Sequence, residues 1–320
     1  CSNCVLPDSF PGIKFDEEKV CNYCTSSFVP DEEKKDQYLK EFESLLADKK
    51  GKHQYDAIVA YSGGKDSTKT LKMLTQDYGL NVLAWTFDNG FLSEQARKNI
   101  LQVTDNVHAT SIIVKPPFSH MKLAFQAAAV KDIYNTKTLD RASSICTTCI
   151  GFVKSLILKT ALEMDIPLVA YGWSPGQAPI ASAIRQTSAR LHKFSDRTIK
   201  DVIIKHTNSE LHRYFLSEVD YEIPKDRWPI NIHPLAFTEY NEDKLIDEIK
   251  TIGWEKPDDT DPNSTNCTLN ALANYIHRER LHFHPYAWEI AGIVRSGNMD
   301  RDHGIEKTTE PENMDMVQFG

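Results

Sequence analysis

The sequence predicts an α/β protein built on a doubly wound parallel sheet, with a cysteine-rich module before the sheet and a helical segment after it. Short apolar runs alternate with amphipathic stretches from residue 55 onward, and a glycine-rich turn joins the first run to the first helix. Of the 320 residues, 41% are hydrophobic and 26% are charged, which is enough to fill a sizeable core. We place the boundaries at 1–30 for the cysteine-rich module, 31–54 for a linker helix, 55–175 for the core and 176–320 for the rest.

The charge balance excludes some classes of function. Lys and Arg total 37 against 45 Asp and Glu, so the net charge is −8 with neutral histidines. An acidic chain lacks the electrostatic footprint of a nucleic-acid binder, which argues against tRNA as a partner. No apolar run approaches the roughly 20 residues that span a bilayer, and no signal-peptide pattern is present. We therefore expect a cytoplasmic protein with no membrane partner.

The order of elements follows from hydrophobic periodicity. Residues 31–50 predict an amphipathic helix, because Tyr38, Phe42 and Leu46 recur at helical spacing among charges. Strands are expected at 57–61, 81–87, 111–115 and 167–171, and helices after Asp66 and over 92–104, 150–164, 268–280 and 286–296. Strands that alternate with helices imply a parallel sheet covered on both faces. Residues 175–265 are less regular, and the polar tail 304–320 is expected to fray.

The glycine-rich turn is the most informative motif. Ser62-Gly63-Gly64-Lys65-Asp66-Ser67 stands between the first strand and the first helix. Glycines let backbone N–H groups turn inward, and the helix N-terminus adds its positive dipole end, so the turn suits an anion such as phosphate. The string is neither a Walker A loop nor the dinucleotide fingerprint. A turn that is glycine-rich without function is the alternative interpretation, and the complete string argues against it.

Two Cys-x-x-Cys pairs frame the N-terminal module. Sixteen residues separate the pair Cys1 and Cys4 from the pair Cys21 and Cys24, a spacing typical of a structural zinc site. A short segment rich in turns cannot build a core of its own, so a tetrahedral Zn²⁺ would supply its folding energy. Free surface thiols are the alternative.

Three further cysteines remain after the zinc site is counted. Cys146 and Cys149 lie just before a predicted helix, and Cys267 follows much later. Three thiolates suit a [4Fe–4S] cluster with one open iron. They equally suit a catalytic dithiol formed by Cys146 and Cys149, a zinc-type site, or cysteines that are merely buried.

A basic stretch lies in the irregular segment. Its cations, at 185–205, are Arg185, Arg190, Lys193, Arg197, Lys200 and Lys205. A solvated face is the simplest interpretation, and the alternative is a site for a phosphorylated or nucleotide-bearing substrate near the carboxyl edge of the sheet.

The Ser62–Ser67 string resembles the PP-loop of the N-type ATP pyrophosphatases. The resemblance implies an adenine nucleotide α-hydrolase-like fold, cleavage of ATP between its α- and β-phosphates, and adenylation of a substrate oxygen. It implies that Ser62, Gly63, Gly64, Asp66 and Ser67 hold pyrophosphate and Mg²⁺ while Lys65 pairs with the phosphates, which makes Asp66 and Lys65 the catalytic candidates. It also implies contacts with adenosine at Thr86-Phe87-Asp88 and with the nucleotide at Gly172. The Tyr171-Gly172-Trp173-Ser174 strand end departs from the Gly-His-x-x-Asp-Asp of many tRNA-modifying members.

A second resemblance covers nearly the whole chain. CVLPDSFPGIKFDEEKVCNYC, YDAIVAYSGGKDSTKTLKML, CTTCIG and NCTLNALANYIHRE are similar to segments of the N-acetyl sugar amidotransferase family of surface-polysaccharide biosynthesis. This similarity implies that a carboxylate on a nucleotide-linked sugar becomes an amide or amidine, with ammonia from a glutaminase-type partner. The family continues Gly-Glu-Asn where this chain has Gly172-Trp173-Ser174, which leaves the acceptor open.

The three later cysteines resemble those of sulfur-transferring PP-loop enzymes of the two-thiouridine type, which hold an iron–sulfur cluster beside ATP. We therefore expect a core that binds ATP and Mg²⁺, a zinc module, and an insertion that binds a small-molecule acceptor. Nitrogen insertion is the first hypothesis. Sulfur insertion with a sulfur-donor partner is the alternative, and a homodimer is left open.

Overall fold

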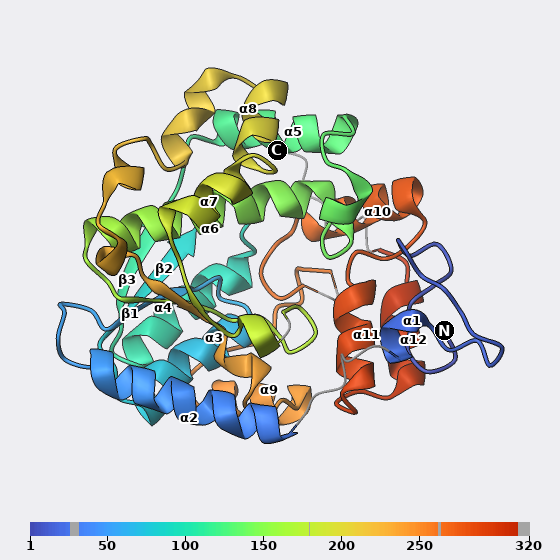
Figure 1. Ribbon diagram of the computed structural model, residues 1–320, viewed down its shortest axis with the longest axis horizontal. Coiled ribbons are helices and arrows are strands. Elements are labelled where there is room, and N and C mark those ends of the chain that lie inside the picture. Colours follow the sequence, from blue (N-terminus) through green and yellow to red (C-terminus); the bar gives the residue numbers. More distant parts are fainter. Residues whose placement is uncertain (26–31, 179, 262–263, 313–320) are drawn as a thin grey trace.

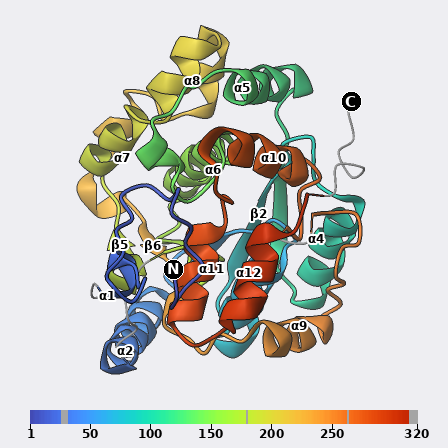
Figure 2. The ribbon, with the colours of Figure 1, turned by 90° about the vertical axis from the view of Figure 1, so that its right-hand side faces the viewer.

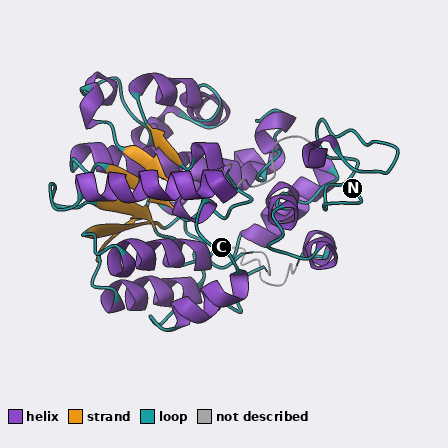
Figure 3. Ribbon diagram, turned by 60° about the horizontal axis from the view of Figure 1, so that its bottom comes forward, coloured by secondary structure: helices purple, strands orange, loops and turns teal. Residues whose placement is uncertain are grey.

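The computed structural model has a mainly parallel sheet at its centre, with helices on both faces (Figures 1 and 3). The structure describes residues 1–25, 32–178, 180–261 and 264–312. The end of the cysteine-rich module, the first residue of the linker helix and the tail beyond residue 312 lie outside the described residues.

In the described part of the chain, six strands pair in the order β3-β2-β1-β4-β6-β5. They are β1 (Ala57–Ala60), β2 (Val82–Phe87), β3 (Thr110–Val114), β4 (Leu168–Tyr171), β5 (Ile184–Gln186) and β6 (Ile230–Ile232). All neighbours run parallel except β5 and β6, which are antiparallel. The chain winds outward from β1 to β3 and then returns to β4 on the other side of β1. A switch point of this kind opens a crevice at the carboxyl ends of the two central strands.

Helices α2, α3, α4 and α9 cover one face of the sheet, and α5, α6, α8 and α10 cover the other. The helices are α1 (Asn22–Thr25), α2 (Glu32–Lys49), α3 (Lys65–Lys72), α4 (Glu94–Asn106), α5 (Phe118–Val130), α6 (Ser144–Glu163), α7 (Ala189–Asp196), α8 (Lys200–His206), α9 (Glu242–Lys250), α10 (Asn270–Leu281), α11 (Ala287–Arg295) and α12 (Arg301–Thr309). A π-helical turn over Met73–Asp77 extends α3. The doubly wound parallel sheet predicted from sequence is confirmed.

Most predicted elements of the core are found close to their expected bounds. The helix expected over 150–164 begins at Ser144, so Cys146 and Cys149 lie in its first turns and not before it. Several other elements were not predicted. The segment thought irregular contains β5, β6 and α7 to α9. The expectation that residues 304–320 fray is wrong for 304–309, which belong to α12, and residues beyond 312 are not described. In α12, Gly304 packs close to Val5 and Ile290, which holds a polar helix against the rest of the molecule.

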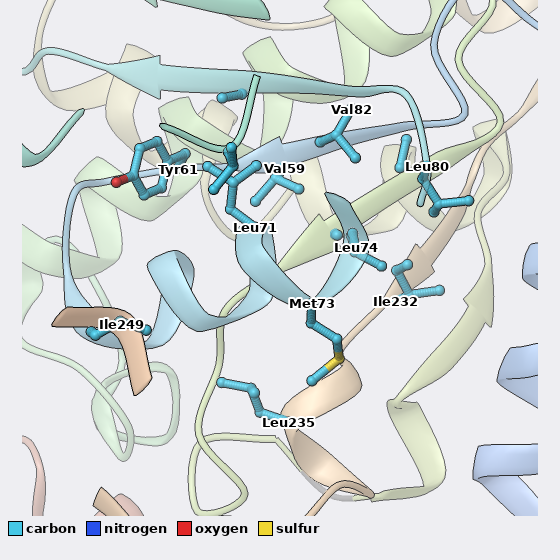
Figure 4. Close-up of a cluster of buried hydrophobic side chains, with 14 of the residues drawn as sticks. Val59, Tyr61, Leu71, Met73, Leu74, Leu80, Val82, Ile232, Leu235 and Ile249 are labelled. Atoms are coloured by element: carbon cyan, nitrogen blue, oxygen red, sulfur yellow. The ribbon is translucent and has the colours of Figure 1, made fainter. Parts of the chain in front are cut away.

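The core beneath the glycine loop is built by α3 and its π-helical turn. Leu71 and Leu74 are buried and lie toward the sheet, where Val59 and Val82 lie on neighbouring strands, whereas the buried Met73 points away from these strands toward Leu235 (Figure 4). Burial of one such side chain stabilises the fold by about 2 kcal/mol. This packing fixes the position of the first turn of α3 relative to β1.

One helix of the described chain, α6, is long and apolar enough to cross a membrane by length and composition alone. The expectation that no such run exists is therefore wrong. The most apolar window of α6 is 56% buried, and the helix packs against β1, β4, α5 and α10. Its apolar composition is explained by this burial, since helices that cover a parallel sheet lie inside the fold.

The N-terminal module lies beside α11 and α12, far from the sheet (Figures 1 and 2). Leu6 and Phe10 are buried against Trp288 of α11, with the rings of Phe10 and Trp288 stacked at 5.7 Å. Arg301 of α12 donates hydrogen bonds to the carbonyl oxygens of Cys1 and Cys4. The two ends of the described chain therefore form one packed unit.

Candidate functional site

The glycine loop turns sharply between β1 and α3. Gly63 has φ +75°, and a Cβ there would lie 2.5 Å from the carbonyl oxygen of Ala96. A Cβ on Gly64 would lie 2.8 Å from Oγ1 of Thr265. Trp254 donates from Nε1 to the carbonyl oxygen of Gly63 at 2.9 Å. Glycine is required at 63 for its conformation and at 64 for the close approach of a distant loop.

Two serines close the loop onto the first turn of α3. The hydroxyls of Ser62 and Ser67 lie 3.2 Å apart, and Ser67 donates to the carbonyl oxygen of Gly64 at 3.0 Å. Gly64 caps α3 without a side-chain hydrogen bond. The Lys65 amide at the start of the helix donates to Oγ1 of Thr265 at 3.2 Å. The positive end of the helix faces the crevice, which is how helix N-termini bind phosphate.

Lys65 and Asp66 form a hydrogen-bonded group with Tyr240. The Lys65 ammonium lies 2.7 Å from Oδ2 of Asp66 and donates to the Tyr240 hydroxyl at 3.1 Å. The Tyr240 hydroxyl donates to Oδ1 of Asp66 at 2.9 Å. Desolvation opposes the charge on Lys65, but Asp66, Tyr240 and Glu242 outweigh it and raise the pKa of Lys65 well above its usual value. Lys65 and Asp66, two of the predicted catalytic residues, therefore orient each other at the loop.

The end of β4 contacts the start of α3. A Cβ on Gly172 would lie 2.5 Å from the backbone nitrogen and Cα of Ser67. The predicted nucleotide contact at Gly172 is thus placed directly against the glycine loop, across the switch point between β1 and β4.

These elements surround a cavity of about 300 Å³, which we call the nucleotide cavity. Most of the loop, the end of β4, α6 and two distant segments contribute to its walls. Its lining residues include Ser62, Gly64, Lys65, Asp66, Ser67, Ile150, Lys154, Gly172, Trp173, Thr265, Asn266, Tyr286 and Glu289. Polar loop groups, a lysine and a helix N-terminus on one cavity are the features expected of a phosphate-binding site.

Glu289 of α11 adds a carboxylate that the sequence did not identify as functional. Ser174 donates to its Oε1 at 2.6 Å. Desolvation raises the pKa of Glu289 to about 7, against the opposing influence of Ser174 and Lys65. A carboxyl group with a pKa near neutrality can exchange a proton at the pH of a cell. No motif marks this residue, because α11 reaches the loop only through tertiary packing.

The predicted adenosine contacts lie at the neighbouring strand end, outside the nucleotide cavity. The Thr86 hydroxyl donates to the carbonyl oxygen of Tyr61 at 2.6 Å. Burial opposes the charge on Asp88, but the Gly90 amide, Arg97 and Lys115 outweigh it and lower the pKa of Asp88. These two side chains are therefore occupied, and Phe87 stacks on Trp85. Binding of adenosine by the backbone groups of residues 86–88 stays a prediction.

The structure brings Cys146, Cys149 and Cys267 together. Asn89 donates from Nδ2 to the Cys149 sulfur at 3.4 Å and to the Cys267 sulfur at 3.9 Å. Asn270 donates to the Cys146 sulfur at 3.9 Å. Burial raises the pKa of all three thiols. Three sulfur atoms with amide donors beside them are the kind of ligands that an iron–sulfur cluster uses, and that these three hold one stays a prediction.

The four N-terminal cysteines converge more tightly. Their sulfur atoms all lie within 4.8 Å of one another, and three pairs are 3.6–3.8 Å apart. A tetrahedron of Zn–S bonds of about 2.3 Å has edges of about 3.8 Å. The amides of Asn3, Cys4 and Cys21 also donate to the Cys1 sulfur. Burial and the neighbouring Cys4 raise the pKa of Cys24 to about 12, so a thiolate at Cys24 needs a cation beside it. The site is built to hold a metal ion.

Comparisons with known proteins give distant similarities. No protein-family model matches the chain. An uncharacterized protein of Methanocaldococcus jannaschii is 23% identical over 317 residues, which cover 98% of this chain and 94% of that protein. The U34-tRNA thiolase NcsA from Methanococcus maripaludis, with its [4Fe-4S] cluster, is 16% identical at a TM-score of 0.36, covering 87% of this chain and 83% of that one. The NMN synthetase from Francisella tularensis is 10% identical at a TM-score of 0.35, covering 70% and 75%.

Proposed function

We propose that this protein is a PP-loop ATP pyrophosphatase that adenylates a small-molecule acceptor and then transfers nitrogen to it. The observation that carries the proposal is the nucleotide cavity at the switch point, where the glycine loop, Lys65, Asp66 and Gly172 meet. A ligand in this position has its phosphates against the N-terminus of α3, and the sequence of the loop resembles that of enzymes that cleave ATP between its α- and β-phosphates.

The first half of the reaction follows from the charges at the loop. An acceptor oxygen attacks the α-phosphorus of ATP, the bond from that phosphorus to the bridging oxygen breaks, and pyrophosphate leaves with the electron pair. Lys65 and the amides of the first turn of α3 stabilise the negative charge that develops on the departing phosphates. Asp66 would hold Mg²⁺, which neutralises phosphate charge when bound.

The second half transfers the nucleophile. Ammonia attacks the adenylated carbon, the carbon–oxygen bond breaks, and AMP leaves with the electron pair while nitrogen loses a proton. Glu289 lines the same cavity, and its pKa suits it to accept that proton. Resemblance to the sugar amidotransferases supports a sugar-like acceptor and an ammonia-supplying partner.

Sulfur insertion is a second candidate, and one observation favours it. The three-cysteine site adjoins the nucleotide cavity, because Ile150 and Asn266, which line the cavity, directly follow Cys149 and precede Cys267. A cluster with one open iron at this position would present sulfide to an adenylated acceptor. The four N-terminal cysteines, in contrast, lie with α11 and α12, and we propose that they hold a structural zinc ion.

Isotope incorporation tests the proposal and separates the two candidates. Purified protein is incubated anaerobically with ATP, Mg²⁺ and a small-molecule filtrate of cells, together with ¹⁵N-labelled ammonium or ³⁴S-labelled sulfide. Mass spectrometry then identifies labelled metabolites that form only when ATP is present. Incorporation of ¹⁵N supports nitrogen transfer, and incorporation of ³⁴S alone places sulfur insertion first. AMP formation without either label contradicts both transfer reactions.

A further inference from the structure

A second cavity of about 580 Å³ adjoins the nucleotide cavity. The two share the residues Ile150, Lys154, Tyr171 and Trp173, which therefore form a common wall. The other walls of the second cavity come from α6 and from the insertion between β4 and β6. A molecule bound in the second cavity that reached this wall would therefore lie next to a nucleotide bound in the nucleotide cavity.

Lys154 is the cation on this common wall. Its side chain is exposed and lines both cavities. The ammonium lies 4.6 Å from the centroid of the Trp173 ring, and no carboxylate of the described chain forms an ion pair with it. Desolvation, Arg141 and Arg185 lower the pKa of Lys154 to about 8. A cation surrounded by other cations lacks the counter-ion that such a group normally has.

The remaining charges of the second cavity do not neutralise Lys154. Arg185 also lines the cavity, and the carboxylate among its lining residues is Asp196. That carboxylate is occupied, because Lys200 lies 3.4 Å away and the Tyr221 hydroxyl donates to it. Of the basic residues at 185–205, Arg185 is the one that lines the cavity. If the basic stretch at 185–205 binds substrate in this cavity, Arg185 is therefore the residue of that stretch that would contact it.

The opposite side of the second cavity is apolar. Leu191 and Phe194 of α7 line it and remain 42% and 69% exposed. Ile199 and Phe215 continue the apolar surface inward. Exposed apolar side chains that gather at a cavity indicate a binding surface. A ligand that fits has an apolar face against α7 and a negative charge toward Lys154.

We propose that Lys154, assisted by Arg185, forms an anion-binding subsite on the wall between the two cavities. Its ligand is an organic anion, a carboxylate or a phosphate ester, whose apolar body occupies the second cavity. This inference rests on the proposed function only in taking that anion to be the acceptor. A carboxylate held at Lys154 would present its oxygen at the boundary of the nucleotide cavity, whereas a phosphate ester would be anchored there by its phosphate.

Calorimetric titration with three matched probes tests the subsite. At pH 7, where Lys154 is protonated, wild-type protein is titrated with 1-naphthoate, 1-naphthyl phosphate and neutral 1-naphthamide. A charge-assisted contact contributes about 1.5 kcal/mol or more, so we expect the anions to bind about tenfold more tightly than the amide. The anion that binds more tightly identifies the head group.

Substitutions of Lys154 test whether this residue causes the tighter binding of anions than of the neutral amide. Lys154→Met removes the charge at similar length and should weaken the anions about tenfold while leaving 1-naphthamide unchanged. Lys154→Arg should retain the preference, and an unchanged melting temperature shows that both variants fold. Equal affinity for anions and amide in the wild type, or an undiminished preference in Lys154→Met, would overturn the inference. ATP titration is independent of these probes: a wild type that binds the anions but not ATP would contradict the proposed function while the subsite stands.

Discussion

A Cβ atom on Gly172 would lie 2.5 Å from the backbone nitrogen of Ser67. The end of β4 and the first turn of α3 therefore approach as closely as two backbones can. Because β1 leads into the glycine loop and β4 lies beside it, this contact fixes the shape of the loop from across the switch point. The geometry of the phosphate site thus depends on a strand that follows it by about a hundred residues.

Gly172→Ala should weaken ATP binding by tenfold or more. The added methyl group must displace the first turn of α3, and such overpacking typically costs about 1–3 kcal/mol. Calorimetric titration with MgATP measures the effect. Gly51→Ala is the control, because Gly51, which unlike Gly172 has a positive φ, has nothing within 4 Å of its Cβ position. It should cost some stability and leave ATP affinity unchanged, and a Gly172→Ala protein with normal affinity would show that β4 does not shape the loop.

Sequence patterns were sufficient for the central part of the fold. The apolar run before Ser62 and the periodic Leu71 and Leu74 after Asp66 define a strand, a turn and a helix by local spacing alone, and the structure confirms them. The N-terminal cysteine pairs could also be recognised from sequence, since the spacing of two Cys-x-x-Cys pairs predicts a metal site with four ligands.

Other parts depend on contacts that no local pattern records. Tyr240, Thr265 and Glu289 reach the loop from segments about 175 to 225 residues away, in stretches with no motif of their own. The helix α5 went unpredicted because it is apolar on most sides, and β5 and β6 have only three residues each. Such short strands are stabilised by the sheet they join rather than by their own sequence.

Cys21→Ser should remove the metal of the N-terminal module and destabilise the C-terminal helices with it. The module packs on α11 and α12 through Leu6, Phe10 and Trp288, so its loss exposes their apolar faces. We expect destabilisation of several kcal/mol, since structural zinc supplies much of the folding energy of such modules. Elemental analysis and thermal unfolding measure both effects. Zinc-free wild-type protein with an unchanged melting temperature in the variant would contradict this account.

Cys267→Ser should abolish an iron–sulfur chromophore in anaerobically purified protein without loss of zinc. The substitution removes one of the three proposed sulfur ligands, the one that accepts from Asn89 at 3.9 Å, and leaves the N-terminal site intact. Absorption spectroscopy and iron analysis provide the measurement, and Cys21→Ser is the reciprocal control. If wild-type protein is free of iron and fully active, the three cysteines do not hold a cluster.

Glu289 should make stability depend on pH. Its folded pKa of about 7 lies above the ordinary value of 4.5, so the folded state retains a proton that the unfolded state releases between these values. The free energy of unfolding should therefore fall as pH rises from 4.5 through 7, by on the order of 2 kcal/mol. Glu289→Gln should remove most of this slope in urea titrations. The exposed Glu218→Gln should retain it, and a variant of Glu289 with the wild-type slope would contradict the assignment.

The central claim is that ATP is cleaved between its α- and β-phosphates at the glycine loop, and the identity of the products tests it most directly. Protein is incubated with ATP labelled at the α-phosphate, Mg²⁺, ammonium and a small-molecule filtrate of cells, and the nucleotides are separated by chromatography. We predict labelled AMP together with pyrophosphate, and a loss of about a hundredfold or more in Asp66→Asn, which removes the carboxylate that binds Lys65 and Tyr240. Asp77→Asn, at an exposed ion pair with Lys72, should be as active as the wild type. Labelled ADP and free phosphate as the products would contradict the account.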